Sequence, residues 1–306
     1  MKKLNFLKAV CSAFLILFYF SACKSLEQSI SSVDALAVLE DDSAVYFKIP
    51  VAKHVDFAKK LLCSTVPGLT EDNADYIIPK VNTMCAGIGK IGAKSLSSRV
   101  QISVDGYLPP LAIKAALTEK NGWKLKKSSV NSKIAGISVP FVYYQRDDTE
   151  YKLGLASLKN VVFAKDVDPL FSRYNLQLDS ITEKGVFVQP ENNWSQSTYD
   201  WMTDETDDIR FCVLYPQSFM KNLLGVEMNF AIANARGYFS EQKDGNFLLS
   251  LEIEFQNSLV VNAAKAVLSL YYGKSITTEA SSNVLKVANI ALSQKKVLEV
   301  VGVNIK

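Results

Sequence analysis

The sequence predicts an α+β fold made of two related halves, each an antiparallel sheet packed with amphipathic helices. Two observations support this class. Short runs rich in β-branched and aromatic residues alternate with segments of helical periodicity. After residue 207 the order of these segments starts again, with little identity. A hydrophobic content of 48% is enough for a large core.

In the first half, a strand at 43–50 ends at Pro50, and an amphipathic helix follows at 51–64. A second amphipathic helix is predicted at 79–91, because Pro79 suits a first helical turn. We expect the remaining elements to be a strand at 99–104, a short apolar helix after Pro109-Pro110, a strand meander at 123–165 and a helix that begins near Asp166.

In the second half, a strand beginning near Asp208 is followed by a lysine-containing helix, as at 43–64. We then expect strands near 229–241 and at 247–255, helices at 258–272 and 282–292, and a final strand at 297–305. The segment 181–207 is polar and acidic, so it is predicted to be the connector between a first half at 33–180 and a second half at 208–306.

The N-terminus has the pattern of an export signal. Lys2, Lys3 and Lys8 precede a short apolar run at 9–20, which is too short for a membrane-spanning helix. The small residues that follow end at Cys23, as in a bacterial lipobox. We therefore expect a signal peptide at 1–22, a lipid on Cys23 and a polar tether through residue 32.

The charge of the exported chain argues against nucleic acid as a partner. Without the three lysines of the signal, basic and acidic residues balance at 31 each. Phosphate binding needs clustered lysine and arginine, so membrane contact beyond the lipid would be mainly apolar. Cys63, Cys85 and Cys212 either include one disulfide or are buried free thiols.

The sequence contains no recognisable catalytic, metal or cofactor site. His54 is the sole histidine, which excludes a histidine-cluster metal site and makes a catalytic triad depend on one residue. On a helical wheel it falls inside an apolar arc, which favours a structural role. We expect no enzyme activity and no cofactor.

The helices carry the strongest functional signal. In 258–272 the polar residues Ser258, Asn262, Lys265 and Ser269 form one narrow stripe, and apolar residues cover the rest. Such a helix is either buried on several sides or lies in a membrane interface. The residues predicted to contact lipid are Val51, Val55, Leu62, Val81, Met84, Ile88, Val261, Val267, Leu268, Val284 and Val287.

This organisation resembles a family of spirochaete (treponemal) outer-membrane lipoproteins. The resemblance covers the lipobox at Phe20–Cys23, the tether, the start Val33-Asp-Ala-Leu-Ala-Val-Leu and the four predicted helices at 51–64, 79–91, 258–272 and 284–292. It implies a lipid-anchored protein of the outer membrane that faces the periplasm. It also implies amphipathic helices that insert into the inner leaflet, and no catalysis.

A second hypothesis is a binding module. A cleft between the two halves would take a ligand or an envelope protein, including a second copy of the chain, with Trp194 and Trp201 at its edge. Aromatic side chains on a polar loop are common in recognition surfaces. The two hypotheses differ in the exposure of the apolar helix faces. Faces that the sheet covers fully would weaken the hypothesis of membrane contact.

Overall fold

A computed structural model describes residues 33–66, 69–91, 99–108, 113, 117–132, 138–184 and 195–301. The strands are β1 (Val45–Pro50), β2 (Val81–Ile88), β3 (Val100–Gly106), β4 (Trp123–Ser132), β5 (Val139–Arg146), β6 (Lys152–Leu155), β7 (Asn160–Ala164), β8 (Ile209–Val213), β9 (Ile232–Glu241), β10 (Phe247–Phe255), β11 (Thr277–Ser281) and β12 (Val284–Leu292). The α-helices are α2 (Ala35–Val38), α3 (Val55–Thr65), α4 (Glu71–Ile77), α6 (Asp168–Lys184), α7 (Gln196–Thr203), α8 (Gln217–Leu224), α9 (Val261–Tyr272) and α10 (Gln294–Val301).

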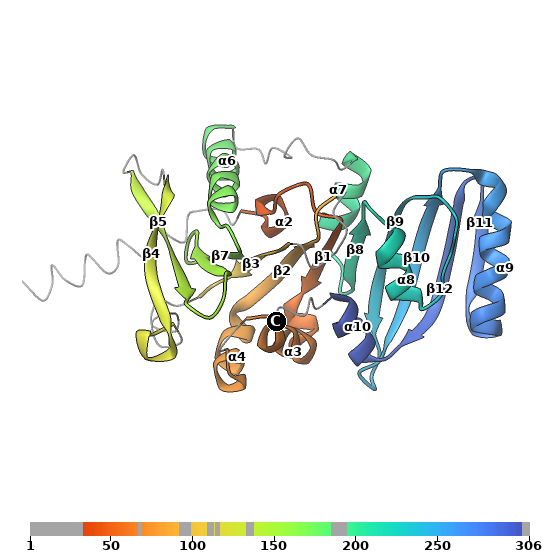
Figure 1. Cartoon of the computed structure of the whole chain (residues 1–306), viewed down its shortest axis with the longest axis horizontal. Helices are drawn as coiled ribbons and strands as arrows, with labels where there is room; N and C mark the ends of the chain where they lie inside the picture. Colours follow the sequence, from red (N-terminus) through yellow and green to blue (C-terminus); the bar gives the residue numbers. More distant parts are fainter. Residues whose placement is uncertain are drawn as a thin grey trace, which may run out of the picture. The chain divides into compact units, whose positions relative to one another are not determined.

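These strands form a single antiparallel sheet in the order β11-β12-β10-β9-β8-β1-β2-β3-β7-β6-β5-β4 (Figure 1). Strands β1 and β8 lie side by side in the middle of the sheet, at the junction between the strands that precede α7 and those that follow it. Phe47 of β1 is there the register partner of Phe211 of β8. From β1 the chain passes through helices to β2 and β3, and from β8 it passes through a helix to β9 and β10. The α+β class is confirmed, and the division into two halves at 181–207 stays a prediction.

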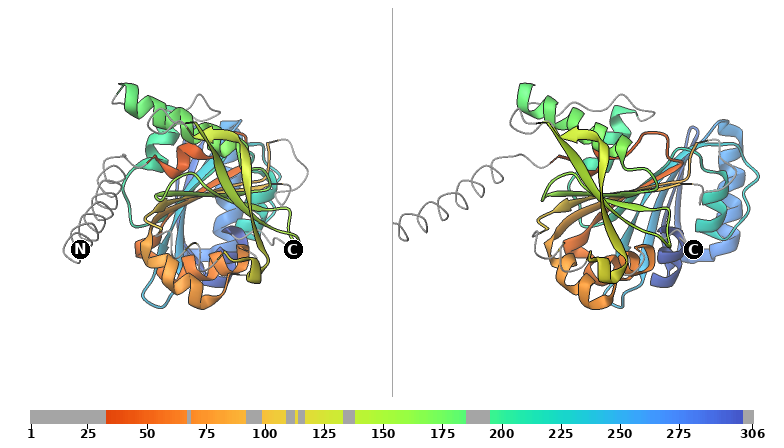
Figure 2. Two further views of the ribbon diagram at one scale, coloured as in Figure 1. Left: turned by 90° about the vertical axis from the view of Figure 1, so that its left-hand side faces the viewer. Right: turned by 60° about the vertical axis from the view of Figure 1, so that its left-hand side comes forward.

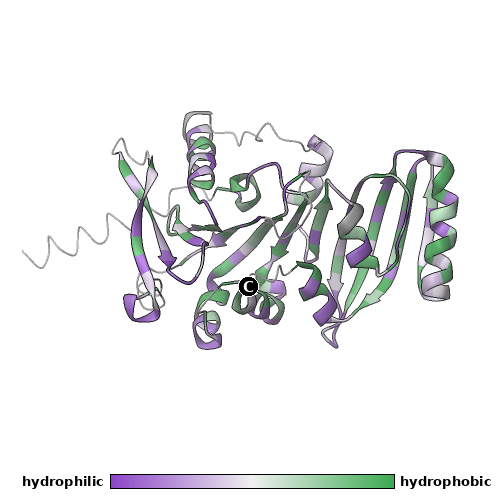
Figure 3. Cartoon of the chain, viewed as in Figure 1, coloured by the Kyte–Doolittle hydropathy of each residue, from purple (hydrophilic) through white to green (hydrophobic). Residues whose placement is uncertain are grey.

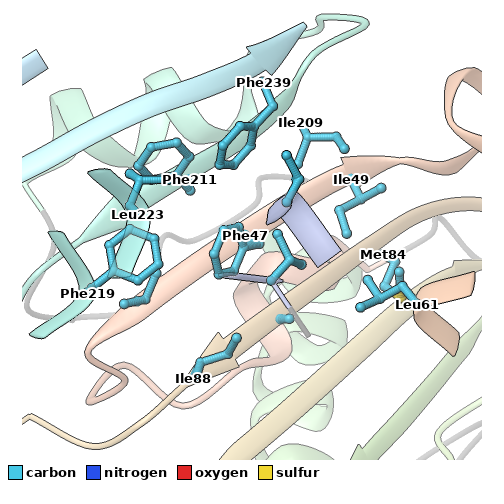
Figure 4. Close-up of a cluster of buried hydrophobic side chains, with 14 of the residues drawn as sticks. Phe47, Ile49, Leu61, Met84, Ile88, Ile209, Phe211, Phe219, Leu223 and Phe239 are labelled. Carbon is cyan, nitrogen blue, oxygen red and sulfur yellow. The ribbon is translucent and has the colours of Figure 1, made fainter. Parts of the chain in front are cut away.

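The core lies mainly on one face of this sheet. Along β10, the residues Phe247, Leu249, Leu251, Ile253 and Phe255 are buried, and the residues between them are partly exposed. This alternation is what a strand with one covered face requires. At the junction, the ring centroids of Phe47 and Phe211 are 6.0 Å apart, and Phe219 of α8 packs against both (Figure 4).

Helices cover both faces of the sheet, but unequally (Figure 2). Helices α3, α4, α8, α9 and α10 contribute to the core that contains Phe47 and Phe247. Helices α2 and α7 pack on the other face around Tyr46, Cys85 and Cys212. Helix α6 packs beside them, where the rings of Phe141 and Phe171 stack with centroids 4.4 Å apart.

The predicted helix at 79–91 is wrong, because Val81–Ile88 form the central strand β2. Residues 84–88 are all buried, since helices cover this strand on both faces. A strand buried on both sides does not alternate. Its apolar positions Val81, Met84, Cys85 and Ile88 happen to match helical spacing, which a short run cannot distinguish from a strand.

The predicted helix at 282–292 is also wrong. Val284–Leu292 form β12, which pairs with β10 and β11. Asn289 has a φ of +67° beside an irregularity in the register with β10. This bulge inserts an extra residue, so the buried positions run Leu285, Val287 and Ile290 and lose the strict period of two.

The predicted final strand at 297–305 is wrong within the described residues, because α10 ends at Val301. Val297 and Val301 are buried, and their spacing of four puts them on one side of the helix. Ser293 caps its start by accepting a hydrogen bond from the Lys296 N–H. Packing on α3 and α8 therefore outweighs the β propensity of the valines. The predicted helix after Pro109-Pro110 lies largely outside the described residues.

Candidate membrane-contact and ligand-binding surfaces

Helix α9 is seated on the sheet by a narrow line of apolar residues. The side chain of Asn257 accepts a hydrogen bond from the Leu259 N–H at 2.9 Å and so begins the helical segment. Val261, Ala264 and Leu268 are buried against β11 and β12. Their spacing of three and four puts them on one side of the helix. Gly273, with a φ of +67°, ends the helix.

The opposite side of α9 is also apolar, and the protein leaves it uncovered. Leu259, in the 3-10 turn Ser258–Val260 that leads into α9, and Ala263, Ala266 and Leu270 of α9 are exposed. Their spacing of 4, 3 and 4 makes one stripe, named here the outer stripe. Leu259 is 84% exposed and Leu270 is 88% exposed. Tyr271 beside the stripe is 59% exposed. The hydropathy view shows the apolar character of this helix at the end of the sheet (Figure 3).

The C-terminal end of α9 is tied to α8 through a tyrosine. The Tyr272 hydroxyl donates a hydrogen bond to the Leu224 carbonyl oxygen at 2.5 Å. Burial raises the pKa of Tyr272 to about 12, because the charged form would lose hydration. The neighbouring Tyr271 ring packs edge-on against it, with centroids 4.9 Å apart. These contacts hold α9 at a fixed orientation.

Helix α3 packs on the same face of the sheet but exposes charged residues. Phe57, Ala58 and Leu61 are buried. On the outer side, the Lys59 ammonium lies 2.8 Å from Asp75 and 3.6 Å from Glu71, both on α4. The helix is therefore covered on its apolar face and hydrated on its polar face, as in an ordinary soluble domain.

An apolar cavity lies between α3, α4 and the sheet. Its volume is about 100 Å³, and Asn73 is the only polar side chain among the described residues that line it. The walls come from α3 and α4, from strands β2, β3, β6 and β7, and from the start of β4, where Trp123 lies. Such a lining suits an apolar ligand. The cavity lies inside residues 62–163, away from the predicted cleft between the halves.

His54 is buried and fully engaged by other groups. It is 4% exposed and directly precedes α3. Its Nδ1 lies 2.6 Å from a carboxylate oxygen of Glu241, and its Nε2 lies 2.6 Å from the Asp207 carbonyl oxygen. A ring held at both nitrogens joins α3 to the end of β9. The predicted burial of His54 is confirmed, and its structural role stays a prediction.

Most residues predicted to contact lipid are core residues in this conformation. Val51, Leu62, Val81, Met84, Ile88, Val261, Leu268 and Val287 are all buried. Val81, Met84, Ile88, Val284 and Val287 lie on strands, so they present no helical face at all. Val267 and Val284 are partly exposed, and Val55 is 44% exposed. Direct lipid contact in this conformation is thus open mainly to Val55 and to the outer stripe.

The sequence indicated that 258–272 is apolar nearly all round but not which side the sheet covers. Leu259 and Leu270 were therefore absent from the predicted contacts, although their spacing in the sequence could have suggested a second apolar side. Trp201 lies on α7, where it lines a polar groove of the sheet. Trp194 and Cys23, the predicted lipidation site, lie outside the described residues.

The three described cysteines are free thiols. Burial raises the pKa of Cys85 and raises the pKa of Cys212 to about 12, so neither is a reactive thiolate. Cys63 on α3 is half-buried. Within the described ranges, no cluster of metal-ligating side chains is present and no helix has the length and apolarity to cross a bilayer.

The fold and its surfaces define a class: an α+β protein with one long antiparallel sheet, helices on both faces and an apolar helix at one end. The chain belongs to the family of the outer membrane-associated lipoprotein TP0453, which matches residues 30–298. Membership confirms the predicted resemblance to treponemal lipoproteins and the localisation at the outer membrane.

Solved structures of TP0453, a treponemal protein, have the same fold. Its crystal form I matches with a TM-score of 0.68 at 13% identity, over 89% of this chain and 98% of that chain. Crystal forms III and IV match over the same shares at the same identity, with TM-scores of 0.66 and 0.62. A search of curated protein sequences found no significant match.

Proposed function

We propose that this lipoprotein is non-catalytic and contacts membrane lipid directly, through the outer stripe of α9 in addition to its lipid anchor. The observation that carries the proposal is the exposure of Leu259 in the turn before α9 and of Leu270 and Tyr271 on α9, whose other side is already seated on the sheet. An uncovered apolar helix side is typical of a membrane or partner contact.

The energetics favour contact without any unfolding. Burying one exposed leucine in hydrocarbon is worth about 2 kcal/mol. The stripe can enter the interface while Val261, Ala264 and Leu268 stay in the core. Because basic and acidic residues balance in the exported chain, ionic attraction contributes little, so binding depends weakly on salt.

The non-catalytic part of the proposal is supported by the state of His54. Both ring nitrogens are occupied, one by Glu241 and the other by a backbone carbonyl, and the ring is 4% exposed. A general base must reach the proton of a substrate or nucleophile, which this ring cannot do without leaving its site.

Liposome flotation tests the membrane contact. The chain from residue 24, which carries no acyl group, is mixed with phosphatidylcholine vesicles at low and high salt. We expect it to float at both salt concentrations. The double variant Leu259→Glu and Leu270→Glu should lose most of this binding, because it puts two charges into the interface.

The matched control is Leu176→Glu on α6, since Leu176 is 64% exposed on another helix. Circular dichroism must show that both proteins keep the fold. Flotation that is lost only in the outer-stripe variant supports the proposal. Equal flotation of the outer-stripe variant and the unchanged chain, or no flotation of the unchanged chain, refutes it.

A second candidate function is the binding of an apolar ligand in the cavity beneath α3 and α4. Its almost fully apolar lining favours a hydrocarbon segment over a polar molecule. The cavity has room for a small hydrocarbon, so binding of benzene should change the fluorescence of Trp123, which lines it. Val104→Phe would fill the space and should weaken that binding, whereas the outer-stripe variant should leave it unchanged. Equal benzene binding by Val104→Phe would refute this candidate.

A further inference from the structure

A polar groove lies on the sheet face opposite α9. Its volume is about 370 Å³, and its floor is formed by β9, β10, β12 and β11. Along these strands the side chains alternate, so the neighbours of the buried core residues point into the groove. Trp201, at the end of α7, lines one end of it. The groove therefore has a polar floor and an aromatic wall.

The wall is held in place by two cations from the sheet. Arg210 of β8 donates a hydrogen bond to the Trp201 carbonyl oxygen, and Lys48 of β1 donates to the Thr203 carbonyl oxygen at 2.8 Å. Positive charges suit the C-terminal end of a helix. The Trp201 ring also lies 4.8 Å from the Arg210 guanidinium and 5.4 Å from that of Arg236. Trp201 is thus positioned before any ligand arrives.

A row of alternating charges crosses the floor. In the strand register, Glu279 of β11 is opposite Lys286 of β12, Lys286 is opposite Glu252 of β10, and Glu252 is opposite Arg236 of β9. Arg236 lies 2.8 Å from Glu252, and Lys286 lies 4.0 Å from it. The row carries no net charge. Each acceptor lies next to a donor.

Hydroxyl groups lie beside this row. Tyr238 and Ser250 are register partners on β9 and β10, and Thr277 lies on β11 next to the groove. A hydroxyl can both donate and accept a hydrogen bond. The floor therefore offers donors and acceptors in alternation over several strands.

We infer that this groove binds a neutral saccharide. A sugar hydroxyl can donate to a carboxylate and accept from an adjacent ammonium or guanidinium, so a polyhydroxylated ring matches the alternating row. The balanced charge disfavours a polyanion, and the polar floor disfavours an acyl chain, in contrast to the cavity beneath α3. The apolar face of a sugar ring can pack against Trp201. This site is independent of the proposed membrane contact.

Ligand-observed NMR with chitotetraose, cellotetraose and maltotetraose tests the inference. The lipidated protein is kept in a detergent without a sugar headgroup. We expect saturable binding of at least one tetrasaccharide. Trp201→Ala and Lys286→Met should each weaken binding by about tenfold or more. The first removes the aromatic ring that packs on the sugar, and the second removes an ammonium that donates hydrogen bonds to it.

The matched control is Lys243→Met, because Lys243 is an exposed lysine in the turn between β9 and β10, outside the lining of the groove. It should bind as the unchanged protein does. No binding of any of the three sugars overturns the inference. Binding that survives in both groove variants, or that also falls in Lys243→Met, overturns it as well. Circular dichroism of each variant separates lost binding from lost fold.

Discussion

Helices α3 and α9 pack on the same face of one sheet but present different surfaces to the outside. Helix α3 buries Phe57 and Leu61 and exposes Asp56 and Lys60, while the half-buried Lys59 pairs with acidic residues of α4. Helix α9 buries a line through Ala264 and Leu268 and exposes leucines at both ends of its outer stripe. Helix α3 therefore has one apolar and one charged side, whereas α9 is apolar on both sides.

The difference shows that an apolar helix face is not in itself evidence for membrane contact. The apolar side of α3 is buried in the core, so its apolar pattern is explained by folding alone. Only apolar area left after the core is complete is available to a membrane or a partner. By this criterion the helical segment 258–272 is the outlier among the helices of the described residues, because Leu259 in its first turn and Leu270 of α9 are both more than four-fifths exposed.

The largest expected effect tests the two sides of α9 against each other. Leu268→Ala should lower the free energy of unfolding by about 3 kcal/mol, because it leaves a cavity at a site with no exposure. Leu61→Ala on α3 should lower the free energy of unfolding by a similar amount. Leu270→Ala should change the free energy of unfolding by less than about 0.5 kcal/mol. Urea unfolding followed by circular dichroism measures all three, and equal losses at Leu268 and Leu270 would contradict the assignment of sides.

A smaller effect is expected from the His54 contact at the start of α3. His54→Ala should cost about 2 kcal/mol, because it removes two hydrogen bonds and leaves the Glu241 carboxylate without its partner. The control is Lys53→Ala, whose ion pair with Asp207 is largely exposed and should matter little. If both variants unfold at the same urea concentration as the unchanged chain, His54 is not a structural contact.

Helix α9 is attached through the hydrogen bond from the Tyr272 hydroxyl to the Leu224 carbonyl oxygen, and the contribution of this bond to stability should depend on pH. Tyr272→Phe should cost about 1 kcal/mol at neutral pH through the lost hydrogen bond to Leu224. Because the folded-state pKa of Tyr272 is about 12, above the ordinary value of about 10, its contribution is complete below pH ~10 and is lost as the pH rises toward 12. The stability gap between the two proteins should therefore narrow over that window. A stability difference that stays constant between about pH 10 and 12 would contradict a link between Tyr272 ionisation and folding.

The sequence predicted the elements whose patterning has a single cause. β10 alternates strictly because one face is covered, and α3 is amphipathic because one face is covered, so both were found near their true bounds. Misassignments occurred where two causes overlap. β2 is buried on both faces, β12 contains a bulge at Asn289, and α10 is a valine-rich segment that tertiary packing makes helical. None of these causes is visible in a local window.

The candidate sites were predictable to a smaller degree. The helix at 258–272 was singled out correctly, but its outward residues depend on which side the sheet covers. The charge row of the groove depends on strand register, since Glu279, Lys286, Glu252 and Arg236 lie on four different strands and meet only across the sheet. Trp201 was predicted on a partner surface and does line a groove, although its role there remains a proposal.

The smallest expected effect is at Val55, the most exposed of the residues predicted to contact lipid. Val55 is the first residue of α3 and is 44% exposed. Val55→Glu should leave stability unchanged or raise it by up to about 0.5 kcal/mol, because a negative charge suits a helix N-terminus. It should also leave liposome flotation unchanged, since the rest of the α3 apolar face is in the core. If α3 enters the interface, the new charge must weaken flotation as strongly as Leu270→Glu does. That result would assign membrane contact to both helices and remove the distinction between them.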